Sequence, residues 1–299
     1  MNIWSFHQLT SMKIYFTILL VVIFMGCSSK YQYCRDYKLN DTYSYKITTY
    51  SKRGNNEQTK STAIAHHTVI KNSRGIPSES IKWKKILIPD AGINYDSIVE
   101  NFQPYEISLH PKGRVELPAL TTPELTGVVT DLNTFFVCLS THTGIDRLSE
   151  VGETYTDPET RIGDFSNDDS IMFGKDCIEL THKLVAIKSD TVIFESKFLP
   201  PQNSDCSEIA YNEHINLLPE ENFNMIRKNG ENSILYFKGT EDFTITSKVE
   251  KQSGKLLYAE MINNLNLKMK LNCTSDLDSC SQEFPFKIWR KVILEIQDN

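Results

Sequence analysis

Apolar and polar residues alternate with a period of two along much of this chain, and this pattern constrains the fold more than any other feature. Successive side chains of a strand point to opposite faces of a sheet, so the alternation predicts strands with one buried face. The pattern covers residues 43–49, 63–69, 79–88, 177–187 and 191–198, and most of 233–296. Short polar or glycine-containing turns separate these stretches, which favours antiparallel pairing.

The sequence therefore predicts a mainly β protein, a β-rich α+β fold with antiparallel, meandering, curved sheets and one or two short helices. The best helix candidate begins after Thr122, a residue suited to a cap, and Pro123, which suits a first turn. We expect this helix to give way to a strand over 134–139, where aromatic and β-branched residues take over. A short helical turn is expected near 220–226.

The expected domain organisation has two β-rich halves, at 42–150 and 176–299, joined by an acidic loop or linker at 151–175. Residues 107–115 and 249–257 both follow the order strand, turn, glycine, basic residue, strand. This similarity suggests that the halves are two copies of one unit, although any hairpin-rich chain can produce so short a match. Residues 27–41 are polar and rich in tyrosine, and are expected to form a tether.

The segment Met12–Lys30 predicts where the protein resides. Lys13 provides a positive charge, and residues 14–25 are uncharged and almost wholly apolar. Crossing a bilayer as a helix takes about 20 apolar residues, so this stretch has the length of a signal-peptide core. Residues 1–11 lack signal character, which makes Met12 an alternative start to Met1. The predicted signal peptide is residues 1–26.

Phe24-Met25-Gly26-Cys27 follows the apolar stretch and resembles the lipobox of bacterial lipoproteins. The resemblance implies that Cys27 is acylated and becomes the first residue of the mature chain, which its acyl chains then hold at a membrane. No acidic run follows Cys27, so by the same resemblance we expect an outer-membrane position facing the periplasm. A cleaved secretory signal without lipidation is one alternative. A eukaryotic secreted protein is another, with sequons at Asn40 and Asn272.

Six cysteines remain after Cys27, and an oxidising compartment favours disulfides among them. Cys273 and Cys280 are separated by six mostly polar residues, which brings them within bridging reach and predicts a Cys273–Cys280 disulfide. The pairing of Cys34, Cys138, Cys177 and Cys206 stays open. Cys138 lies in an apolar run and suits a buried thiol.

Charge and motifs exclude several function classes. The net charge is −6 and dispersed, and no basic patch with interleaved aromatics predicts a nucleic-acid partner. With 40% apolar residues the chain can form a packed core. No nucleophile elbow, zinc-protease motif, calcium loop or phosphate loop occurs, so we predict no catalytic residues, no metal and no cofactor.

A few polar residues still merit a structural interpretation. His66 and His67 are neighbours on a predicted strand and would point to opposite faces, so they cannot share a metal. His142 lies in a loop that suits bonding to local backbone. Asp164, Asp168, Asp169 and Asp176 fit no calcium-loop spacing and are expected to form a solvated acidic loop.

Three hypotheses of function follow. The first is a non-enzymatic envelope lipoprotein whose curved sheet binds an apolar ligand or lipid. Its predicted architecture is loosely similar to the half-barrel family of lipoprotein carriers and lipid-transfer lipoproteins. The second is a structural or assembly subunit that contacts other envelope proteins. The third is a glycan hydrolase. A carrier needs apolar residues on the concave face, a subunit an apolar outer patch, and a hydrolase two ionisable groups in one cleft.

Overall fold

The computed structural model describes residues 30–88, 95–119, 125–157, 165–166, 170–173, 179–199, 222–228, 233–274, 277 and 279–297. Residues 32–299 form one compact unit. Every helix and strand described below belongs to this unit. No helix within the described ranges has the length and apolar character needed to span a membrane.

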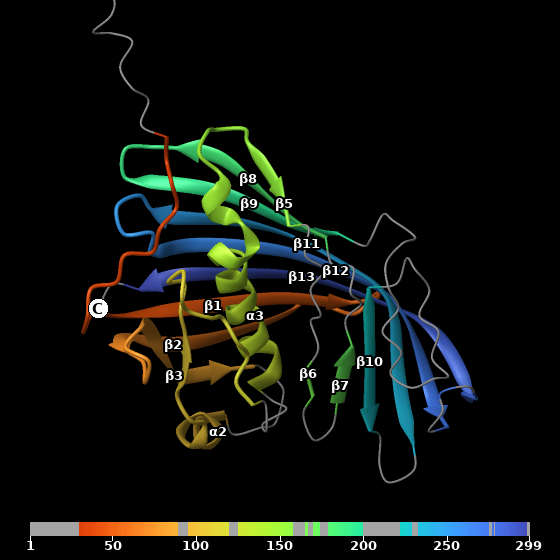
Figure 1. Ribbon diagram of the computed structural model, residues 1–299. Coiled ribbons are helices and arrows are strands. Elements are labelled where there is room, and N and C mark those ends of the chain that lie inside the picture. The colour runs from red at the N-terminus through yellow and green to blue at the C-terminus, as the bar shows by residue number, and fades with distance from the viewer. Residues whose placement is uncertain are drawn as a thin grey trace, which may run out of the picture. The chain divides into compact units, whose positions relative to one another are not determined.

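Thirteen strands of the described residues form one antiparallel sheet. They are β1 Thr42–Arg53, β2 Thr59–Lys71, β3 Pro77–Leu87, β4 Tyr105–Ile107, β5 Thr154–Thr156, β6 Phe165–Ser166, β7 Ser170–Phe173, β8 Glu179–Ile187, β9 Thr191–Leu199, β10 Phe223–Lys228, β11 Ile234–Glu250, β12 Leu256–Cys273 and β13 Gln282–Gln297. The helices are α2 Tyr95–Asn101 and α3 Thr126–Val137, with the short turns η2 Thr141–Thr143 and η3 Ile145–Arg147. The predicted mainly β, antiparallel and curved fold is confirmed (Figure 1).

The sheet joins the beginning and the end of the chain. Its order is β4-β3-β2-β1-β13-β12-β11-β10-β7-β6, so β1 pairs directly with the last strand. The two ranges expected as separate halves thus contribute to one sheet. The range 151–175, expected as a linker, contains β5, β6 and β7, which pair into it.

The sheet forks along β11. The second part of β11, from Phe243 to Glu250, pairs with β9. Its first part, from Ile234 to Gly239, pairs with β10. The sheet therefore has two branches on this side, β9-β8-β5 and β10-β7-β6, and residues 240–242 lie between them.

Helix α3 lies over one face of the sheet, called here the inner face (Figure 1). It buries Val128, Val129, Leu132, Phe135 and Phe136, whose spacing places them on one side of a helix. Phe136 stacks on His67 of β2 with 5.7 Å between ring centroids and meets the edge of Tyr45 of β1. These contacts form the core between the helix and the sheet.

The predicted strand at 134–139 is wrong, because α3 continues through Val137. Phe135 and Phe136 are both fully buried, and packing of this kind overrides the strand preference of aromatic residues. The expected capping residues Thr122 and Pro123 lie outside the described residues. The helical turn expected near 220–226 is also wrong from residue 223, where β10 begins.

The segment before β1 packs against the sheet, which contradicts the predicted tether for residues 32–41. Tyr33 and Arg35 are buried and alternate with exposed neighbours. The Tyr33 hydroxyl donates to the Gly254 carbonyl, and the Asp36 amide donates to the Ser253 carbonyl. The sequence does not reveal this alternation, because its buried positions are occupied by tyrosine and arginine and not by aliphatic residues.

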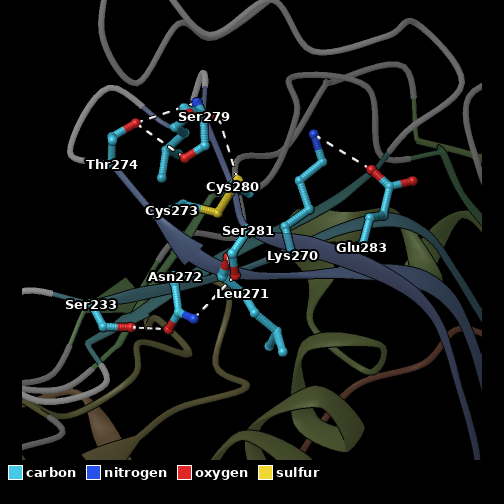
Figure 2. Close-up of a disulfide and its surroundings, with 11 residues drawn as sticks. Ser233, Lys270, Leu271, Asn272, Cys273, Thr274, Ser279, Cys280, Ser281 and Glu283 are labelled. Carbon is cyan, nitrogen blue, oxygen red and sulfur yellow. Dashed lines mark hydrogen bonds and ion pairs between the residues drawn. A yellow bond between two sulfur atoms is a disulfide. The ribbon is translucent and has the colours of Figure 1, made fainter.

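The predicted Cys273–Cys280 disulfide is present (Figure 2). It joins the end of β12 to the residues just before β13, across a turn in which the Thr274 hydroxyl donates to the Ser279 carbonyl and accepts from the Ser279 amide. Beside it, the Asn272 side chain accepts from Ser233 and donates to Ser281. The disulfide and these bonds hold the tip of the β12–β13 hairpin.

Candidate functional site

The strand registers place side chains of the inner face in rows that cross the sheet. Under α3, one row contains Val292, Met261, Ile245 and Ser196. The next row towards the β10 branch contains Arg290, Asn263, Phe243 and Phe198. The following rows contain Ile288, Leu265 and Glu241, and then Phe286, Leu267, Gly239 and Phe223. The inner face therefore changes from apolar to polar and back to apolar along β11, β12 and β13.

The second apolar region is called here the β10–β13 cluster, and its described members all come from strands. They are Phe223, Met225, Leu235, Phe237, Leu265, Leu267, Met269, Phe286 and Ile288. The buried members retain 5–9% of their surface, and the other five are only partly buried. Core residues under α3, such as Val292 and Ile245, retain none. Phe284, which pairs with Met269 at the margin of the cluster, is 41% exposed.

Between the two apolar regions lies a polar band, formed by Asp131 of α3, Glu241 of β11, Asn263 of β12 and Arg290 of β13. Arg290 and Asn263 are cross-strand partners. Arg290 forms a close ion pair with Asp131. The Asn263 amide nitrogen donates to Glu241 Oε1 at 2.8 Å, and its own oxygen is buried without a hydrogen-bond donor among the described residues.

Glu241 lies at the fork of the sheet, where neither β9 nor β10 pairs with it. The side chain of Asn222 takes the place of a strand: it accepts from the Glu241 amide at 2.7 Å and donates to the Glu241 carbonyl at 2.8 Å. Burial raises the pKa of Glu241, and the hydrogen bond from Asn263 offsets only part of that shift. Glu241 keeps part of its surface exposed.

A second group of charged side chains is fully enclosed under the other end of α3. Glu79 of β3 accepts from His67 Nδ1 at 2.8 Å and from Arg35 at 3.2 Å, and Arg35 also donates to the Tyr43 hydroxyl. Burial by itself would raise the pKa of Glu79, but His67 and Arg35 together hold it below its ordinary value. With no exposed polar surface, this group stabilises the core and offers nothing to a ligand.

The residues singled out in the sequence do not converge on one site. His67 is buried and His66, on the opposite face, bonds Ser44, as the strand geometry predicts. His142 contacts the Gly113 carbonyl at 2.9 Å. Cys34 and Cys138 are free thiols, and burial raises the pKa of Cys138 to about 12.

Other expected residues fall outside what the structure describes. These are Cys27, Cys177, Cys206, Asp164, Asp168, Asp169 and Asp176. Within the described ranges, no group of three or more His, Cys, Asp or Glu side chains is placed to hold a metal ion.

The polar band was missed from sequence. Phe243, Ile245, Met261, Val292 and their neighbours mark the buried face, so positions two residues further along each strand are also expected on that face. By this rule Glu241, Asn263 and Arg290 all lie on the buried face. Their meeting also requires that β11, β12 and β13 pair, which the sequence does not show.

No protein-family model matches the chain, and no curated protein matches it in sequence. Among solved structures, lipovitellin, from a study of its lipid–protein interactions, is 11% identical with a TM-score of 0.42. The match covers 88% of this chain but only 26% of the lipovitellin chain. A LolA-superfamily protein from Nitrosomonas europaea is 7% identical with a TM-score of 0.14, and the match covers 88% and 86% of the two chains. Scores below 0.5 do not establish a shared fold, so the function rests on the site.

Proposed function

We propose that the protein is a non-enzymatic binding protein that holds an apolar ligand or lipid on the inner face of its sheet, at the β10–β13 cluster. The observation that carries this proposal is that five large apolar side chains from four adjacent strands stay only partly buried beside four buried ones. Contiguous exposed apolar surface of this kind marks binding sites in soluble domains. Each square ångström of apolar surface that a ligand removes from water contributes about 25 cal/mol to the free energy of binding.

The proposal includes a membrane position for the chain. The segment before the folded unit carries the apolar stretch and Cys27, and acylation of Cys27 would anchor the protein in the cell envelope. A lipid-anchored binding protein would take its ligand from the same membrane. The support for this part of the proposal is the sequence of residues 12–30.

The alternative of a structural subunit predicts an apolar outer patch. On the outer face, the described residues of β1, β12 and β13 include Lys46, Glu260, Lys291 and Glu295. Glu260 accepts from the Tyr258 hydroxyl and pairs with Lys291 at 3.0 Å. This part of the outer face is polar, and the apolar cluster of Ile226, Tyr236, Cys273 and Leu277 beside β10 is buried at 3–7% exposure, so the described outer surface favours the inner face as the place of recognition.

A glycan hydrolase is the second candidate, because Asp131 and Glu241 place two carboxyl groups in the polar band. Paired carboxyl groups are the usual machinery of glycoside hydrolysis. Asp131, however, is 5% exposed and committed to Arg290. A catalytic acid has to reach the sugar, so this pairing favours binding over hydrolysis.

Mass spectrometry of protein purified from its own membrane tests the proposal. We expect an intact mass that includes acyl chains on Cys27 and, in an organic extract of the same sample, one further lipid per chain. A Cys27→Ser variant, expressed without the signal segment, is the control for carry-over of bulk membrane lipid. An extract without a stoichiometric apolar compound would contradict the binding function, and an unmodified Cys27 would contradict the anchor.

A further inference from the structure

The polar band and the β10–β13 cluster are continuous on the inner face. Leu265 follows Asn263 by two residues on β12, so the two side chains are neighbours on the same face. Ile288 and Arg290 stand in the same relation on β13. A ligand whose chain lies on the cluster therefore has one end against the band.

The charges of the band do not balance. Asp131 and Arg290 neutralise each other. Glu241 forms no ion pair with any residue that the structure describes. Asp242 points to the outer face, where it accepts from Asn264, and the exposed Arg53 lies three strands away in the row of Ile288. The band therefore carries one uncompensated carboxylate when Glu241 is ionised.

Among the described residues of the band, the buried polar atom without a hydrogen-bond partner is an acceptor, the Asn263 oxygen, while the remaining N–H groups of Arg290 lie on a side chain that is 24% exposed. The Asn263 nitrogen donates to Glu241 Oε1 and to the Asp242 carbonyl, which fixes its amide orientation and leaves its oxygen as a buried acceptor that no described residue meets. The remaining lone pairs of the Glu241 carboxylate are acceptors as well. Leaving the buried Asn263 oxygen unpaired costs about 1–3 kcal/mol, so a ligand that supplies a donor there is favoured.

We infer that the polar band binds the head of an amphiphile that carries a protonated primary amine, while the alkyl chain of the same molecule lies on the β10–β13 cluster. This inference rests on the proposed function. An ammonium group supplies three donors, no acceptor and one positive charge, which complements Glu241 and the Asn263 oxygen. A carboxylate or phosphate head would meet the negative charge of Glu241 and supply no donor when ionised.

Three C12 amphiphiles with different heads test the inference: dodecylammonium, dodecanol and dodecanoate, each titrated calorimetrically below its micelle concentration at pH 7. We expect dodecylammonium to bind at least about tenfold more tightly than dodecanoate, in keeping with a charge-assisted hydrogen bond. Glu241→Gln keeps the shape of the side chain and should abolish this preference while dodecanol binding persists. Asp242→Asn is the matched control, since it removes the same charge from the adjacent residue on the outer face.

The outcomes distinguish binding of an apolar chain, which is the proposed function, from selection of the head group, which is the inference. Equal affinity for the three heads, or a preference that survives in Glu241→Gln, would overturn the inference and leave apolar binding intact. Loss of preference in both variants would show that general charge attraction, and not the band, selects the head. If no C12 compound binds, the proposed function fails and the inference fails with it.

Discussion

At the residue scale, the chain buries charge in two different ways. The group of Arg35, His67 and Glu79 is shut off from the surface, and its charges pair with one another, although His67 Nε2 has no hydrogen-bond partner among the described residues. The polar band is open: among the described residues Glu241 forms no ion pair, although Arg290 nearby offsets part of the rise that burial causes in the pKa of its carboxyl, and the Asn263 oxygen has no hydrogen-bond partner. A closed group serves the fold, whereas an incomplete group beside an apolar surface is suited to a ligand.

Glu79→Gln tests the closed group. The change leaves Arg35 buried without its counter-ion, so we expect a loss of about 3 kcal/mol in the free energy of unfolding at pH 7. The pKa of Glu79 is lower in the folded than in the unfolded protein. The ionised carboxylate therefore stabilises the fold fully above the unfolded-state pKa of about 4.3, and this stabilisation is lost as pH falls through the folded-state pKa. Urea denaturation of the wild type and the variant at pH 7 measures the loss of unfolding free energy. The same measurement at pH 3 shows how much of that difference disappears in acid.

Glu116→Gln is the control for that experiment. Glu116 pairs with Arg114 at 3.1 Å, but both side chains are largely exposed. Surface pairs of this kind contribute little, so the unfolding free energy should not change measurably. A Glu79→Gln difference that is as small as the control, or equal at both pH values, would contradict a stabilising role for the buried group.

Sequence alone could predict part of this residue-scale picture. The alternation at 63–69 predicted that His66 and His67 point to opposite faces, and in the structure His67 is the buried one. It could not predict that Glu79 meets both Arg35 and His67, because Arg35 comes from a segment without a clear alternation of aliphatic residues. Partner choice among charged residues is decided by the three-dimensional pairing of strands, which leaves no mark on local periodicity.

At the element scale, the main differences from prediction concern where elements end. A glycine within alternating residues often marks a break, but β11 runs from Ile234 to Glu250 through Gly239 without one. At Gly239 φ is 149°, and a Cβ atom there would lie 2.3 Å from the Asn266 carbonyl oxygen. The glycine thus permits close approach of β12 and does not end the strand. Glycine is ambiguous in sequence for this reason.

The tip of the β12–β13 hairpin provides a prediction at this scale. The Cys273–Cys280 disulfide closes a short loop, and chain entropy alone assigns such a cross-link about 2 kcal/mol. The double variant Cys273→Ser/Cys280→Ser should lose that amount in the free energy of unfolding. Because the hairpin carries Met269, Phe284 and Phe286, apolar probe binding should weaken as well.

Thermal or urea unfolding of the oxidised wild type, the reduced wild type and the double variant measures the effect of the disulfide. Reduction should reproduce the loss in the wild type and have no effect on the double variant. Unchanged stability in the double variant would show that the hydrogen bonds of the turn, such as those between Thr274 and Ser279, hold the hairpin without the disulfide.

At the scale of the whole molecule, the sequence predicted the class of fold but not which distant strands pair. Antiparallel curved sheet follows from alternation and short turns. The pairing of β1 with β13 and the fork of β11 join segments that are distant in the sequence, and period-two patterns do not encode such partners. The candidate site depends on both features, which explains why its residues were not found beforehand.

The central claim is that the inner face binds an apolar ligand, and titration with N-phenyl-1-naphthylamine, which fluoresces in apolar surroundings, tests it most directly. Phe284→Asp places a carboxylate at the exposed margin of the β10–β13 cluster, and Leu199→Asp does the same to an apolar residue of β9 that is 38% exposed. We predict saturable binding to the wild type and to Leu199→Asp, and affinity at least about tenfold weaker for Phe284→Asp, because a charge against an apolar ligand is costly. Equal affinity in the two variants, or no saturable binding to the wild type, would contradict the account.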